Sequence, residues 1–149
     1  MRWVTVFLTL AACGEFSESV GAAAPLGTVW QLVRVNDDPA EGRLSLVFVS
    51  GGGVRGALPC NTWRAEQTAP LPWFELSEFA ATTRACDQAA LERRYTALLQ
   101  SMDLAEVAGD VMLLTAPDGQ SLEFRAPTPE YPLRAFSVQS ESVIIRKRV

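Results

Sequence analysis

The amino-acid sequence predicts a single α+β domain in which a curved, mostly antiparallel sheet packs on one main helix. Several short segments alternate apolar and polar residues between turns rich in glycine and proline, which is typical of half-buried strands. One segment, from Asp87 to Met102, instead repeats its apolar residues with helical spacing. The chain has 149 residues, of which 48% are hydrophobic and 20% are charged. This is enough apolar material for one core.

The first half of the chain predicts a series of strands. Residues 28–35 form the first strand, with Trp30 on its inward face, and residues 44–49 alternate in the same way. The glycines at 51–53 predict a hairpin turn, after which residues 54–58 return. A phosphate-binding loop is disfavoured here, because the glycine run lacks the Gly-Lys-Ser/Thr ending and no helix signal follows it.

The second half predicts the main helix and a C-terminal meander. Residues 73–76 read as a further short strand, and Asp87 is a suitable N-cap for the helix. The buried stripe of the helix consists of Leu91, Tyr95, Leu98 and Met102. The strands of the meander are residues 104–107, 111–115 and 121–125. Residues 127–149 form a C-terminal extension in which we expect one added hairpin.

The N-terminus predicts export and lipidation. Residues 3–10 form a short apolar core behind a positive charge, and residues 10–13 (Leu-Ala-Ala-Cys) match a bacterial lipobox. The apolar stretch is shorter than the ~20 residues that span a bilayer. We therefore expect residues 1–12 to be a lipoprotein signal peptide, Cys13 to carry lipid, and residues 13–26 to be a flexible tether. The alternative is a buried first strand that carries a chance cysteine.

The residue after the lipobox cysteine predicts the destination. It is Gly14, and not the aspartate that would resemble an inner-membrane retention signal. We therefore expect an outer-membrane lipoprotein that faces the periplasm. The acyl chains on Cys13 would anchor the protein in the membrane. Each buried CH₂ group contributes about 0.8 kcal/mol to membrane binding.

The composition argues against several functions. The chain has no histidine, which excludes Ser-His-Asp and Cys-His catalysis, and its net charge of −4 disfavours nucleic-acid binding. The cysteine spacing fits no zinc pattern, and the acidic cluster at 37–41 lacks the pattern of a calcium loop. No pair of carboxylates is placed for acid–base chemistry. We therefore expect no enzyme activity, no metal and no cofactor.

Two cysteine motifs indicate a family. Cys60-Asn61 follows the glycine hairpin, and a segment from Thr82 to Cys86 precedes the helix, after a Trp-x-Leu strand that contains Trp30. With Glu92 near the helix start, this ordered set resembles the META/HslJ domain over about residues 27–126. The resemblance implies a small α+β envelope domain, often a lipoprotein, associated with heat or antibiotic stress. No catalytic residues are established for the family, so none are carried over.

The two motif cysteines have several interpretations. Cys60 and Cys86 are the pair that is left once Cys13 carries lipid, and cysteines outside the cytoplasm tend to oxidise. We expect a disulfide, which would stabilise the fold by about 3.5 kcal/mol on the chain-entropy model. Two separate buried thiols are the alternative, and a redox sensor would need an exposed thiol of low pKa. Asn61 and Thr82 are expected to make local hydrogen bonds in turns.

Two classes of function fit these observations. The first is a non-catalytic, monomeric envelope module that binds a protein partner, with Trp63 and Trp73 as candidate surface residues, since tryptophan is enriched in binding hot spots. Core packing is the alternative role of these side chains. The second class is a carrier of a small apolar ligand or lipid, in a pocket between sheet and helix.

Overall fold

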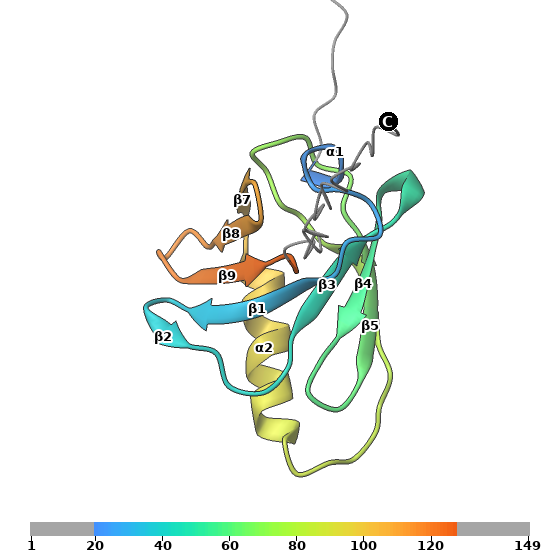
Figure 1. The fold of residues 1–149 in the computed structure, drawn as a ribbon. Helices are drawn as coiled ribbons and strands as arrows, with labels where there is room; N and C mark the ends of the chain where they lie inside the picture. The colour runs from blue at the N-terminus through green and yellow to red at the C-terminus, as the bar shows by residue number, and fades with distance from the viewer. Residues whose placement is uncertain (1–19, 128–149) are drawn as a thin grey trace, which may run out of the picture.

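The computed structural model describes residues 20–127, which form one curled antiparallel sheet packed against one main helix (Figure 1). Eight strands follow the order β6-β5-β4-β3-β1-β9-β8-β7, and a short β2 pairs only with β1. The predicted α+β class is therefore confirmed. The strands are β1 Trp30–Val35, β2 Asp38–Pro39, β3 Ser45–Phe48, β4 Gly53–Ala57, β5 Thr62–Glu66, β6 Ser77–Ala81, β7 Leu104–Ala108, β8 Val111–Thr115 and β9 Ser121–Arg125.

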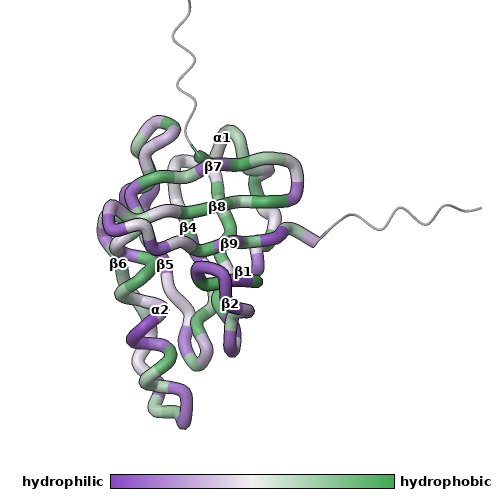
Figure 2. The backbone as a smooth tube through the Cα atoms, turned by 90° about the vertical axis from the view of Figure 1, so that its left-hand side faces the viewer, coloured by the Kyte–Doolittle hydropathy of each residue, from purple (hydrophilic) through white to green (hydrophobic). Residues whose placement is uncertain are grey.

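Strand pairing brings the two ends of the domain together. β1 lies antiparallel to β9, with Gln31 opposite Arg125 and Val35 opposite Leu122. The predicted C-terminal meander is confirmed as β7, β8 and β9, and hydrophobic segments recur along these strands (Figure 2). The predicted hairpin at the glycine run is also present, where a 3₁₀ turn, η1 (Ser50–Gly52), joins β3 to β4.

The main helix, α2 (Ala89–Ser101), begins two residues later than predicted. Gln88 stands at the N-cap position and its side chain makes no capping bond, so the assignment of Asp87 as N-cap is wrong. The buried face of the helix consists of Tyr95, Leu98 and Leu99, and the buried Met102 follows the helix as its C-cap, while the predicted Leu91 is only half-buried. These side chains pack against large core residues of the sheet, which include Trp30, Phe48, Met112, Leu114, Leu122 and Phe124.

One predicted strand is wrong. Residues 73–76 form only an isolated bridge, between Trp73 and Leu104, and the edge strand forms further along as β6. The bridge consists of two backbone bonds, in which the Phe74 N–H donates to the carbonyl of Asp103 and the Ala105 N–H donates to the carbonyl of Pro72. At the next residue the Glu75 N–H donates to the side chain of Gln67 and not to a strand, so the pairing does not extend along the segment.

Described structure is already present before the predicted domain start at residue 27. A short helix, α1 (Val20–Ala23), lies ahead of β1, and the side chains of Val20 and Ala24 are fully buried. The predicted signal peptide, the lipidated Cys13, the earlier part of the tether and the C-terminal hairpin lie outside the described residues. Neither helix within residues 20–127 combines the length and apolar character needed to cross a bilayer.

Candidate functional site

The motif residues converge at the start of α2. Cys60, in the turn between β4 and β5, is joined by a disulfide to Cys86, which precedes the helix. Their Cα atoms lie 6.2 Å apart, within the range that disulfides require. The predicted pairing is therefore present. The bridge ties together two segments separated by 26 residues.

The side chain of Asn61 forms the centre of a hydrogen-bond network beside the disulfide. Its Oδ1 accepts from the Thr82 hydroxyl at 2.8 Å and from the Arg84 N–H at 2.7 Å. Its Nδ2 donates to the Arg84 carbonyl and to the Glu92 carboxylate. Asn61 is 4% exposed, so the network satisfies a buried amide on both sides. The bonds cross more than 20 residues of sequence, so they are not the local turn bonds that the sequence suggests.

Glu92 completes this network from the first turn of α2. Its Oε2 accepts from the backbone N–H groups of Cys60 at 2.9 Å and Asn61 at 3.0 Å, and its Oε1 faces the Asn61 amide. We call Asn61, Thr82, Glu92 and the Cys60–Cys86 disulfide the clamp. Glu92 is not one of the residues of the predicted buried stripe, so helical periodicity does not reveal this role. The signal in the sequence is the family motif, which has an acidic residue near this position.

The groups of the clamp stabilise the fold. The polar groups described above bond to one another or to the backbone, and both sulfur atoms are joined in the disulfide. Within residues 20–127, histidine, cysteine, aspartate and glutamate side chains form no cluster of three or more that could hold a metal ion. The clamp thus fixes the start of the helix on the sheet.

Trp63 was a candidate for a binding surface, and the structure places it in the core. Its side chain is 2% exposed and lies across Gly56, its partner on β4. The indole Nε1–H donates to the Ser45 carbonyl at 3.2 Å, and the ring stacks on Phe79 with centroids 5.4 Å apart. A glycine on the neighbouring strand creates this space, which the local sequence around Trp63 does not show. Trp73, in contrast, is 54% exposed.

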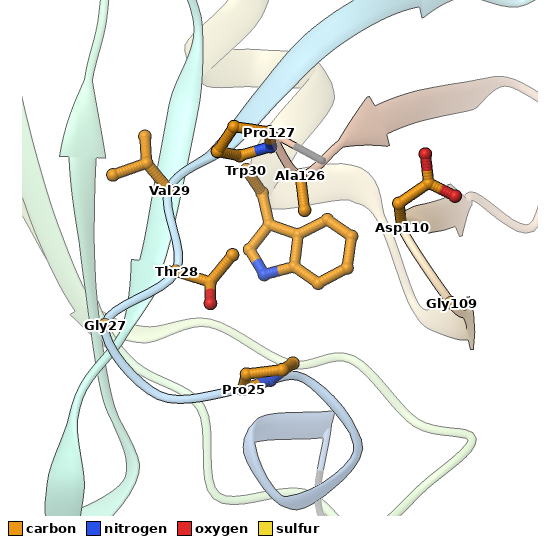
Figure 3. Close-up of a pocket in the computed structure, with 9 residues that line it drawn as sticks. All are labelled: Pro25, Gly27, Thr28, Val29, Trp30, Gly109, Asp110, Ala126 and Pro127. Atoms are coloured by element: carbon orange, nitrogen blue, oxygen red, sulfur yellow. The ribbon is translucent and has the colours of Figure 1, made fainter. Parts of the chain in front are cut away.

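An apolar cavity of about 550 Å³ opens at one end of the sheet (Figure 3). Its walls come from the segment before β1, the turn between β7 and β8, and the end of β9. Pro25, Val29, Ala126 and Pro127 supply apolar surface, and the indole of Trp30 lies in the middle of the lining residues. This volume is within the ~300–1,000 Å³ of small-molecule sites.

Three polar side chains border this end cavity. Trp30 is fully buried, and its Nε1–H has no hydrogen-bond partner in the part of the chain that the structure describes. Thr28 contributes a hydroxyl, and Asp110 contributes a carboxylate whose side chain is half-exposed and lies 3.6 Å from Arg125. An apolar lining with a few polar groups is typical of a site that binds and orients a small molecule.

The space between sheet and helix, where the sequence predicts a ligand pocket, contains no comparable apolar cavity among the described residues. There Tyr95, Leu98 and Leu99 of α2 pack into the core. A hollow of about 460 Å³ does lie between the β1–β2 hairpin and α2, but charged residues such as Glu41 and Arg94 line part of it. The Tyr95 hydroxyl donates to the Glu41 carbonyl at its edge. The apolar cavity therefore lies at the end of the sheet instead.

The curled sheet, the single main helix and the clamp define a class of small half-barrel domains. The family model of the META domain matches residues 23–128, which is most of the chain. The chain belongs to the META domain family. The resemblance inferred from the cysteine motifs is thus confirmed, and the match includes Ala23 and the buried Ala24 ahead of β1.

Solved structures share this fold at low sequence identity. The NMR structure of a protein from Burkholderia xenovorans is 17% identical, with a TM-score of 0.59, and the alignment covers 86% of this chain and 99% of that one. The crystal structure of a DUF4847 family protein from Bacteroides vulgatus is 11% identical, with a TM-score of 0.54, and covers 66% of this chain and 91% of that one. No curated protein matches the chain. These similarities establish the fold alone.

Proposed function

We propose that the protein is a non-catalytic binding domain of the bacterial outer membrane that carries a small apolar ligand in the end cavity. The observation that carries this proposal is the apolar cavity of about 550 Å³ around Trp30. The recognisable family motif, in contrast, is used to hold the helix on the sheet. Binding and not chemistry is therefore the role that the described geometry supports best.

The ligand is tested by recovering it with the protein. The protein is released from membranes in detergent and analysed by native mass spectrometry, followed by extraction. Ala126→Phe places a phenyl ring in the cavity, and Ala80→Phe is a matched control at a half-buried alanine outside it. We expect a bound molecule in the wild type and in Ala80→Phe, and its loss in Ala126→Phe. The same molecule in all three proteins would refute the proposal.

The location is part of the proposal and is supported by the sequence alone. The lipobox that ends at Cys13 predicts lipidation, and Gly14 predicts the outer membrane. The family resemblance suggests a role in envelope integrity during heat or antibiotic stress. Metabolic labelling with palmitate, compared between wild type and Cys13→Ser, tests the anchor. We expect label and outer-membrane fractionation only in the wild type, and equal labelling of both proteins would refute it.

A protein partner is the second candidate function, and the exposure of Trp73 favours it. This side chain is 54% exposed, which is unusual for a large aromatic residue. Exposed tryptophans are common in binding hot spots. Cross-linking in envelopes, with Trp73→Ala compared against the distant exposed change Val33→Ala, tests this function. A stoichiometric partner that is lost only in Trp73→Ala would support it. Retention of the partner by Trp73→Ala would exclude this surface.

A further inference from the structure

The indole N–H of Trp30 distinguishes the end cavity from a simple apolar gap. Its side chain is 0% exposed, yet the Nε1–H has no acceptor within residues 20–127. Within the same residues, the buried indole of Trp63 donates to the Ser45 carbonyl. Buried donors in folded proteins almost always have a partner, because an unpaired one loses the hydrogen bond that water would supply.

The nitrogen of this donor lies among the residues that line the cavity. Figure 3 shows the Trp30 indole surrounded by the lining residues, with its nitrogen on the side of Thr28 and Pro25. Neighbouring backbone donors are already used within the fold: the Thr28 N–H donates to Pro25, and the Ala126 N–H donates to Asp110. The Trp30 Nε1–H is therefore a donor that no group within residues 20–127 uses. Less than 1 Å² of its nitrogen is accessible, so a molecule in this space reaches it only when the side chains beside it move aside.

The charge at the rim limits what that molecule can be. Asp110 borders the cavity, and Arg125, which lies 3.6 Å from it, also pairs with Glu123 at 2.9 Å. Two carboxylates and one guanidinium leave a net negative charge at this side, which disfavours an anion. The rest of the lining is largely apolar, so a neutral molecule of low polarity fits best.

We infer that the end cavity binds a neutral, mostly apolar molecule whose carbonyl or ester oxygen accepts a hydrogen bond from the Trp30 Nε1–H. This inference rests on the proposed function, because it concerns the same cavity. It adds a polar contact that selects among apolar molecules. A site with a buried donor discriminates against ligands that have no acceptor to pair with that donor.

The test uses ¹⁵N-labelled full-length protein carrying Cys13→Ser, with the disulfide oxidised, and observes the indole N–H signals. Three probes separate shape, acceptor and charge: acetophenone, isopropylbenzene of similar shape without the acceptor, and benzoate. We expect acetophenone to move the Trp30 signal downfield and isopropylbenzene to bind without that downfield shift. Benzoate should bind at least about tenfold more weakly than acetophenone. The Trp63 signal is an internal control, since its N–H is already bonded.

Trp30→Phe provides the matched affinity measurement. It removes the N–H and keeps an aromatic ring, so we expect acetophenone affinity to fall about tenfold, as one lost hydrogen bond implies. The affinity for isopropylbenzene, which has no acceptor, should fall by less than about threefold. The difference between the two probes cancels their unequal transfer from water and any change in cavity size. If Trp30→Phe does not fold, the indole shift in the Trp30 protein decides the question.

The outcomes separate this inference from the proposed function. If acetophenone and isopropylbenzene both bind but the Trp30 signal does not move downfield, the acceptor is refuted and an apolar carrier stands. If none of the probes binds, the proposed function fails as well. Contacts between the Trp30 indole proton and residues 128–149 in the free protein would also overturn the inference, because the chain itself would then fill the cavity.

Discussion

Replacing Glu92 by glutamine should destabilise the domain although the two side chains have nearly the same shape. Glu92 accepts hydrogen bonds at both oxygens, from the Cys60 and Asn61 backbone N–H groups and from the Asn61 amide. A glutamine can keep its oxygen toward the backbone donors, but its NH₂ then faces the NH₂ of Asn61. Asn61 cannot rotate to relieve this, because its oxygen already accepts from Thr82 and Arg84.

The size of this effect follows from the bonds that are lost. One hydrogen bond to a charged group disappears, which is worth about 1.5–3 kcal/mol, and a buried donor loses its partner at a cost of about 1–3 kcal/mol. Because Glu92 is half-buried, we expect a loss of about 2–4 kcal/mol in the free energy of unfolding at neutral pH. Glu106→Gln, at an exposed position on β7, is the control and should change it by less than about 0.5 kcal/mol.

A second substitution tests the orientation of the network. Asn61→Asp alone places a carboxylate against Glu92 and should also destabilise the fold. In the double variant, the new carboxylate at position 61 would accept from the glutamine NH₂ while its other oxygen still accepts from Thr82 and from the Arg84 N–H. Only the bond to the Arg84 carbonyl would stay lost. Denaturant unfolding should therefore show that the double variant recovers at least half of the summed loss. Purely additive losses, or a single Glu92→Gln loss below about 0.5 kcal/mol, would refute this account of the clamp.

Three further predictions concern other parts of the fold. Gly56→Ala should reduce the free energy of unfolding by more than about 3 kcal/mol, because its added Cβ would lie 1.7 Å from the Ser45 carbonyl oxygen; a loss below about 1 kcal/mol would contradict this. Reduction of the Cys60–Cys86 disulfide should lower the free energy of unfolding by about 3.5 kcal/mol, measured by denaturation with and without reductant. Burial raises the pKa of Tyr95. Its contribution to stability is therefore complete below the unfolded pKa of about 10 and is lost as pH rises through the folded value. Tyr95→Phe should remove that alkaline loss, and an unchanged alkaline profile would count against it.

Local patterns predicted the elements whose partners are close in sequence. β7, β8 and β9 alternate apolar and polar residues and are joined by short turns, so each strand pairs with the next one along the chain. The stripe on α2 was predicted for the same reason, since Tyr95 and Leu98 recur with helical spacing within one element and the buried Met102 follows directly as its C-cap. The motif set located the disulfide and Asn61 in sequence, although it did not show which groups they contact.

The errors share one cause, which is contact between distant segments. The segment at 73–76 looks like a strand, but after the single bridge from Trp73 to Leu104 the Glu75 N–H bonds to the side chain of Gln67 and not to a neighbouring strand. Trp63 is a surface candidate in the sequence, but in the structure Gly56 on the neighbouring strand leaves room for its ring in the core. Neither Gln67 nor Gly56 carries a local signal for these roles.

The linear chain was sufficient to predict the class of fold, the family and the pair of cysteines. These depend on periodicity, turn residues and an ordered set of motifs, all of which are properties of the linear chain. The three-dimensional packing was needed to show that Glu92 and Asn61 share hydrogen bonds and that Trp63 belongs to the core. It also revealed the cavity in which the Trp30 N–H lies unpaired within residues 20–127. Hydrogen-bond partners and cavities depend on which distant segments the curled sheet brings together, and no local pattern encodes that.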